Sequence, residues 1–256
     1  MASKLTNSVR DCKKALAPLG QKTYPYKPVK DSLFPMSYAP SEVARLTMVA
    51  QQIRTCGVLD ERLLDRLRLV AREDFVPPAH QALAFADMAI PLGRGQIMFT
   101  PMLEARLLQA LALTPHDRVL EIGTGSGYLT AVMAGLTAAV HSVEIIPEFK
   151  LRAAHNLKPL GCDHVTLEIG DGARGWPRHG PYDAILISGA LPLGPGPAFR
   201  ASLALGGRMV AIVGSSPAME VQVITRVEDA VFTTRTLLET DVPPLINAPS
   251  PSPFQF

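Results

Sequence analysis

Hydrophobic positions in the second half of the chain alternate between helical and strand spacing. Apolar residues three or four positions apart predict helices over residues 102–113, 128–136 and 148–157. Short apolar runs predict strands over residues 118–122, 140–144, 165–168, 183–188 and 209–213. Because alternating elements of these lengths are joined by right-handed crossovers, the pattern predicts an α/β fold with a doubly wound, mostly parallel sheet.

The remaining apolar segments predict how the sheet is covered and where it ends. Residues 184–187 and 209–213 are almost continuously apolar, as expected for strands covered by other elements on both faces. Residues 220–227 and 231–240 alternate between apolar and polar positions, which predicts an antiparallel pair at the edge. The sheet would then have seven strands. The proline-rich end of the chain predicts an extended strap over the surface.

A helical lead-in is predicted before this sheet, over residues 41–100. Ser41 is expected to cap a helix that stops at Gly57, and Asp60 is expected to open a second helix. Leucines of the second helix share one face and are predicted core residues. Further on, Thr100 followed by Pro101 is typical of an N-cap and a first helical position. We expect the loop before Thr100 to line a pocket.

Charge and composition separate an N-terminal extension from the rest of the chain. Residues 1–40 contain five prolines and carry a net charge of +5, whereas the remainder carries −3 and is predicted to form one domain over residues 41–256. The extension is expected to be flexible, to act as a transit peptide, or to pack on the domain or on a partner, including a second copy. The acidic body argues against a nucleic-acid surface, and no apolar run is long enough for a membrane span.

The three cysteines, Cys12, Cys56 and Cys162, lie far apart and lack the spacing of metal ligands. We therefore predict no metal site. Cysteines that are odd in number and far apart favour a reducing compartment, and we expect the protein to be cytoplasmic.

The most informative motif is a glycine-rich loop directly after the strand Arg118–Ile122. Gly123, Gly125 and Gly127 follow the spacing G-x-G-x-G, whereas dinucleotide folds use G-x-G-x-x-G. Glu121, just before the loop, is a poor neighbour for a pyrophosphate but suits a ligand with an ammonium or sulfonium group. At the ends of the next two strands, Glu144 can accept the ribose hydroxyls and Asp171 can meet an adenine amino group. The pattern favours S-adenosylmethionine over NAD.

Several blocks of the sequence resemble the protein-L-isoaspartate O-methyltransferase family, within the class I S-adenosylmethionine-dependent methyltransferases. The resemblance covers roughly residues 43–240 and is most specific in residues 70–77, 90–96 and 118–128. It implies a sheet whose last strands are rearranged relative to other class I enzymes. It also implies that S-adenosylmethionine is held by Glu121, Gly123, Thr124, Gly125, Ser126, Gly127, Tyr128, Glu144, Ile145, Asp171 and Gly172.

The chain departs from this family in the substrate loop formed by Gln96, Ile97, Met98, Phe99 and Thr100. The family pattern is G-Q-T-I-S-x-P, and its Thr and Ser hydroxyls face the carboxylate that accepts the methyl group. Here Ile97 takes the Thr position and Phe99 the Ser position, so both hydroxyls are lost. No catalytic residue is identified. The leading hypothesis is therefore a methyltransferase with a different acceptor, which can be a small molecule or another carboxylate.

Two further hypotheses remain open. One is the isoaspartyl repair activity of the family. The other is a non-catalytic protein that binds S-adenosylmethionine.

Overall fold

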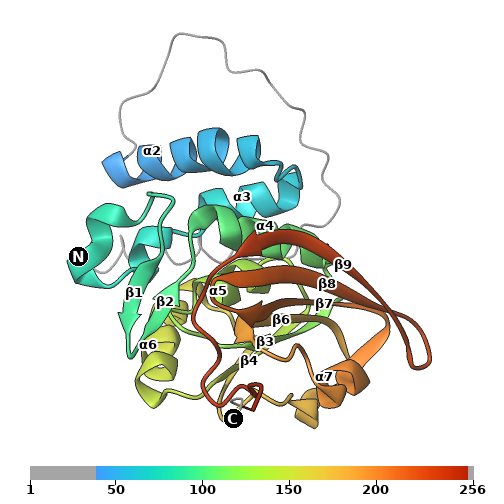
Figure 1. Ribbon diagram of the computed structural model, residues 1–256. Helices are drawn as coiled ribbons and strands as arrows, with labels where there is room; N and C mark the ends of the chain where they lie inside the picture. Colours follow the sequence, from blue (N-terminus) through green and yellow to red (C-terminus); the bar gives the residue numbers. More distant parts are fainter. Residues whose placement is uncertain (1–38, 253–256) are drawn as a thin grey trace.

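The fold is a seven-stranded sheet with helices on one face and a thinner layer on the other (Figure 1). The computed structural model describes residues 39–252, so nearly all of the predicted extension lies outside the described residues and the division at residue 40 stays a prediction. The strands are β3 (Arg118–Ile122), β4 (Ala139–Glu144), β5 (Val165–Ile169), β6 (Tyr182–Leu191), β7 (Leu203–Ser215), β8 (Ala218–Glu228) and β9 (Val231–Thr240).

The order of these strands is β5-β4-β3-β6-β7-β8-β9. The pairs from β5 to β7 are parallel, while β7–β8 and β8–β9 are antiparallel. The predicted mostly parallel sheet with an antiparallel pair at its edge is therefore confirmed. β3 and β6 are neighbours in the sheet but not in sequence, because strands β4 and β5 are added on one side of β3 and strands from β6 onward on the other. Doubly wound sheets bind ligands at this point, where the strand order reverses.

Two groups of core residues explain why the strands are apolar at nearly every position. On one face, Ala184 and Leu186 pack with the helices α4 (Pro101–Leu111), α5 (Tyr128–Ala134) and α6 (Pro147–Leu157). On the other face, Ile185 and Ile187 pack with Phe199 of the short helix α7 (Pro197–Ser202) and with Trp176. Successive strand residues point to opposite faces, so both faces require apolar side chains.

The N-terminal helices pack beside α4 and confirm most of the predicted lead-in (Figure 1). The helix α2 (Pro40–Thr47) continues as the π-helix η1 (Met48–Ile53) and the 3-10 turn η2 (Arg54–Cys56), and ends at Gly57 with a φ of 84°. Asp60 caps α3 (Glu61–Leu69) through hydrogen bonds from two backbone amides, and leucines of that helix are buried.

The predicted cap at Ser41 is wrong. The cap lies two residues earlier, at Ala39, and Pro40 is in the first turn. Pro40 fits there because its fixed φ is helical and it has no N–H to leave unsatisfied.

Short elements connect α3 to α4, and the structure adds a hairpin to the predicted loop. The 3-10 turns η3 (Arg72–Phe75) and η4 (Pro78–Leu83) precede the hairpin of β1 (Ile90–Gly93) and β2 (Gln96–Met98). Its turn residues Gly93, Arg94 and Gly95 all have positive φ. Strands of four and three residues are too short to show a period in sequence. The cap at Thr100 is confirmed, since its hydroxyl accepts a hydrogen bond from the Leu103 amide at 3.2 Å.

The end of the described chain forms the predicted strap, which we call the C-terminal strap (residues 243–248). The Ala190 amide donates to the Pro243 carbonyl, and the Leu245 amide donates to the Ala190 carbonyl, both at 3.0 Å. This ties the strap to the carboxyl end of β6. Elsewhere, η5 (Lys158–Leu160) and η6 (Pro177–His179) are single 3-10 turns. Within residues 39–252, no helix combines the length and apolar character needed to cross a membrane.

Candidate active site

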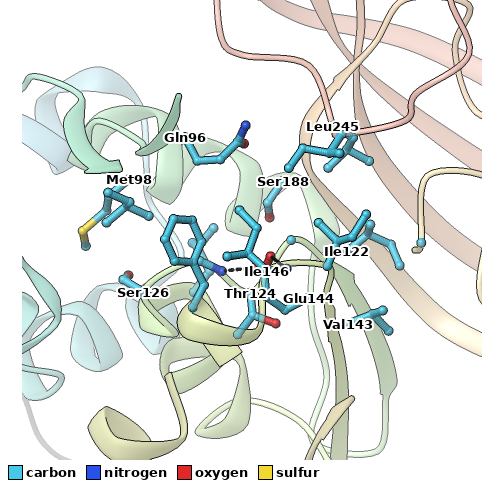
Figure 2. Close-up of a pocket in the computed structure, with 18 of the residues that line it drawn as sticks. Gln96, Met98, Ile122, Thr124, Ser126, Val143, Glu144, Ile146, Ser188 and Leu245 are labelled. Atoms are coloured by element: carbon cyan, nitrogen blue, oxygen red, sulfur yellow. Dashed lines mark hydrogen bonds between the residues drawn. The ribbon is translucent and has the colours of Figure 1, made fainter. Parts of the chain in front are cut away.

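A cavity lies at the carboxyl ends of the central strands, between the glycine-rich loop, the β1–β2 hairpin and the C-terminal strap (Figure 2). It encloses about 750 Å³, part of which is open to solvent. The predicted site residues that line it are Gln96, Ile97, Met98, Phe99, Gly123, Thr124, Gly125, Ser126, Tyr128, Glu144, Ile145, Asp171 and Gly172. Three predicted residues do not line it: Thr100, Glu121 and Gly127.

The glycine-rich loop has a backbone that other residues could not easily adopt. Gly123, Gly125 and Gly127 have φ values of 93°, 55° and 85°, in the left-handed region that favours glycine. A Cβ on Gly127 would lie 3.0 Å from the Cβ of Ala153 on α6. Gly127 thus lets the helix after the loop pack closely, although it does not face the cavity.

Glu144 joins the end of β4 to this loop. One carboxylate oxygen accepts a hydrogen bond from the Gly125 amide at 2.8 Å, and the other accepts from the Ile146 amide at 2.9 Å. A carboxylate oxygen has two lone pairs, so each oxygen keeps one free for a further donor in the cavity. The carboxylate is therefore fixed in place and still able to bind hydroxyl groups.

Asp171 lies after β5 at the far side of the cavity from β6. Its two oxygens accept hydrogen bonds from the Ala173 amide and from the Asn247 side chain of the strap, both at 3.0 Å. Gly172 is required because a Cβ there would meet Ile122 at 2.8 Å. Asn247 was not anticipated from sequence, since nothing local in its proline-rich surroundings indicates that it reaches Asp171.

Glu121 lies beneath the loop and supports it from the core. It is fully buried, and one of its oxygens accepts hydrogen bonds from Thr130 and from Ser142. Because Ser142 donates its proton to Glu121, Thr124 must donate to Ser142 across their 2.6 Å contact. Burial raises the pKa of Glu121 to about 7, against the lowering effect of these two hydrogen bonds. Glu121 therefore does not line the cavity, and the ligand contact that the sequence analysis expected of it stays a prediction.

The acid that faces this part of the cavity is Glu104 on α4, which the sequence analysis did not single out. It is 2% exposed, and its carboxylate accepts a hydrogen bond from Arg72 Nε at 3.0 Å. Burial raises the pKa of Glu104 to about 7, with Arg72 opposing the shift. The fully buried Arg72 also donates to the carbonyls of Ala84 and Phe99, both at 2.7 Å. The sequence does hold one signal for Glu104, because it is the single acid in the mostly apolar helix α4.

The substrate loop presents apolar side chains to the cavity. Ile97 and Phe99, which replace the hydroxyl residues of the family pattern, both line it, and Phe99 is 5% exposed. The carbonyl of Phe99 is held by Arg72. Ser188 on β6 and Leu245 and Ile246 of the strap complete the wall and were also not anticipated from sequence.

Comparison with known proteins identifies the family. The model of the protein-L-isoaspartate(D-aspartate) O-methyltransferase family matches residues 44–248. The chain belongs to this family. It is 41% identical over 202 residues to the protein-L-isoaspartate O-methyltransferase of Roseiflexus castenholzii, covering 79% of this chain and 91% of that protein. With its counterpart in Anaeromyxobacter dehalogenans it shares 43% identity over 203 residues, 78% of this chain and 97% of that protein.

Family membership confirms two predictions: that the protein is a methyltransferase, and that its cofactor is S-adenosylmethionine. The fold also matches solved structures. A Plasmodium falciparum protein assigned to the same family, in complex with S-adenosyl-L-homocysteine, superposes with a TM-score of 0.68 at 18% identity. That comparison covers 78% of this chain and 97% of the other. At this identity the match supports the fold alone.

Proposed function

We propose that the cavity holds S-adenosylmethionine across the ends of β5, β4 and β3. Asp171 lies at the adenine end, Glu144 at the ribose, and the glycine-rich loop beside the methionine part. The observation that carries this proposal is the fixed carboxylate of Glu144, bonded to the Gly125 and Ile146 amides and open to the cavity. Gly123, Gly125 and Gly172 line the cavity without side chains, which is consistent with close approach of a ligand to the backbone.

Glu104 is the residue we assign to the cationic end of the cofactor. S-adenosylmethionine carries an ammonium and a sulfonium, and a buried carboxylate that lines the cavity stabilises such charges strongly. Glu104 thus takes the role that the sequence analysis expected of Glu121. Glu121 instead holds Thr124 in place through Ser142. Arg72 limits the cost of burying the Glu104 carboxylate.

We further propose that the methyl acceptor is the carboxylate of an isoaspartyl residue in a peptide, as the names of the relatives suggest. When bound, S-adenosylmethionine supplies a methyl group to the acceptor oxygen while its carbon–sulfur bond breaks, and no proton is transferred. A carboxylate is ionised at pH 7, so the chain needs no strong base. Its residues need only align the acceptor and exclude water. Ile97 and Phe99 provide an apolar wall that excludes water.

A second candidate is a methyltransferase for a more apolar acceptor. Ile97 and Phe99 both line the cavity where the family pattern has hydroxyls, and this observation favours it. The hydrogen bond from Arg72 to the Phe99 carbonyl holds the loop backbone in place. The side chains of this loop therefore contribute directly to the shape of the acceptor site.

One experiment separates the two candidates. The full chain is incubated with labelled S-adenosylmethionine and either an isoaspartyl peptide or its aspartyl counterpart. We expect methyl incorporation into the isoaspartyl peptide alone. Binding of S-adenosylmethionine without methylation of that peptide contradicts the isoaspartyl proposal and leaves the second candidate.

A further inference from the structure

Ser188 lies where β6 departs from regular pairing. The parallel register between β6 and β7 shifts between Leu186 and Ala190, so Ser188 and Gly189 fall in a bulge. Bulges next to functional sites commonly redirect a side chain out of the regular alternation. Here the bulge places Ser188 on the wall of the cavity, at the end of the strand next to β3.

The hydroxyl of Ser188 has an unused hydrogen-bonding capacity. Its Oγ is buried, and no partner for it exists among the described residues. Leaving a buried polar atom unpaired costs about 1–3 kcal/mol, so such an atom on a cavity wall indicates a ligand group that completes it. A Cβ on Gly123 would lie 3.5 Å from the Ser188 Cβ, which places this hydroxyl directly beside the first glycine of the loop.

The cavity wall carries three other hydroxyls, those of Thr124, Ser126 and Tyr128. Thr124 Oγ1 is bonded to Ser142, and Ser126 Oγ accepts from the Tyr128 amide at 3.3 Å. The Tyr128 ring is fully buried against Phe75 and lies 5.5 Å from the Arg72 guanidinium. Like Ser188 Oγ, the Tyr128 hydroxyl has no partner among the described residues, and Ser126 still has its proton to donate. Ser188 is distinguished by its place in the bulge near the carboxyl end of β6, beside Gly123. Figure 2 shows its side chain in the same part of the cavity as the amide of Gln96.

We propose that Ser188, assisted by the Gln96 amide, is the donor that holds the acceptor carboxylate, in place of the hydroxyls absent at Ile97 and Phe99. This rests on the proposed isoaspartyl function and deepens it. Ser188 reaches the acceptor from β6 and Gln96 from the start of the substrate loop, while Ile97 and Phe99 contribute only apolar contacts. Specificity for a carboxylate is thereby kept without the hydroxyls of the family loop.

The test compares Ser188→Ala with Ser188→Thr in the full chain, using an isoaspartyl peptide and labelled S-adenosylmethionine. Loss of one hydrogen bond to a charged group corresponds to an increase in peptide KM of about 10- to 100-fold. We expect that increase for Ser188→Ala, with the KM for S-adenosylmethionine unchanged, and near wild-type values for Ser188→Thr. Ser215→Ala, at the exposed end of β7, is the matched control and should change neither constant.

A double variant tests whether Ser188 takes over the role of the hydroxyl that the family loop has at position 99. Adding Phe99→Ser to Ser188→Ala should recover part of the lost peptide affinity, because it returns a hydroxyl to the cavity wall. An unchanged peptide KM in Ser188→Ala, in a wild type that methylates the peptide, overturns this inference alone. A rise in the KM for S-adenosylmethionine instead shows that Ser188 serves the cofactor, and also overturns it. A wild type that neither binds nor methylates the peptide overturns the proposed function together with the inference.

Discussion

Glu144 shows how one buried side chain can both shape the binding loop and face the ligand. Replacing it with Ala removes the acceptor for the Gly125 and Ile146 amides as well as the proposed ribose contact. Each hydrogen bond to a charged group contributes about 1.5–3 kcal/mol, so we expect affinity for S-adenosylmethionine to fall by at least about 10-fold. Calorimetric titration measures this directly.

The matched control is Glu148→Ala. Glu148 is exposed and pairs with Arg94 at 2.5 Å on the outside of the hairpin, so its removal should leave affinity almost unchanged. Equal affinities in the wild type and Glu144→Ala would contradict the ribose assignment.

Glu104 predicts a dependence of cofactor binding on pH. Burial raises its pKa from 4.5 to about 7, so the folded protein holds this proton more tightly than the unfolded chain does between those values. A cationic ligand favours the ionised carboxylate. Affinity for S-adenosylmethionine should therefore rise as pH increases through about 7, and binding near pH 6.5 should release a proton.

Calorimetry in buffers of different ionisation enthalpy measures that proton. The release should disappear in Glu104→Gln and persist in Glu121→Gln, since Glu121 also has a raised pKa but does not line the cavity. If proton release is lost only in Glu121→Gln, then Glu121 contacts the cationic group of the cofactor, and the assignment to Glu104 is wrong.

At the scale of elements, Arg72 joins three segments that are distant in sequence. From η3 it reaches η4 through the Ala84 carbonyl, the substrate loop through Phe99, and α4 through Glu104. Arg72→Ala leaves a buried carboxylate and two carbonyls without their partner. Breaking a buried ion pair in this way costs about 3–5 kcal/mol, and we expect the melting temperature to fall by about 6–20 °C.

Arg68→Ala is the control for this element. Arg68 pairs with Asp65 at the surface of α3, so its removal should cost less than about 1 kcal/mol. If the two variants melt at the same temperature, Arg72 does not anchor the loop as described. The double variant Arg72→Met, Glu104→Met should be more stable than Arg72→Ala, because it leaves no buried charge unpaired.

The C-terminal strap forms part of the cavity wall, and its close approach depends on Gly189. A Cβ on Gly189 would lie 2.7 Å from Leu245 Cδ2, so Gly189→Ala must displace the strap. We expect faster release of S-adenosylmethionine, with stability lowered only modestly, measured by stopped-flow displacement. Gly196→Ala is the control, because nothing lies within 4 Å of the added methyl and the backbone is extended. Release rates that match the wild type in both variants would show that the strap does not retain the cofactor.

The elements that could be predicted from the sequence are those with a clear period. The strand Arg118–Ile122 was predicted to the residue, and Val231–Thr240 likewise, because apolar runs and alternation identify them. The β1–β2 hairpin was missed because its strands are too short to display a period. The π-helix η1 was also missed, since helical spacing alone does not distinguish it from an α-helix.

For the whole molecule, the sheet order explains why part of the site could be predicted and part could not. Gly123, Glu144 and Asp171 lie at or just beyond the carboxyl ends of strands, and neighbouring parallel strands bring these ends together, so local sequence was sufficient. Glu104 and Ser188 reach the cavity through a helix face and a bulge, and Asn247 of the strap reaches Asp171. Their positions depend on long-range packing, which no local pattern records.

The last prediction concerns the basic N-terminal segment. The part of the chain that the structure describes, residues 39–252, contains the seven strands of the sheet, both groups of core residues and a cavity lined from its own elements. A chain lacking residues 1–38 should therefore keep its melting temperature within about 2 °C and its affinity for S-adenosylmethionine within about twofold. Light scattering of the two chains tests whether the segment, with its net charge of +5, mediates self-association. A loss of stability on truncation would instead show that the segment packs on the domain, because only buried contacts could account for it.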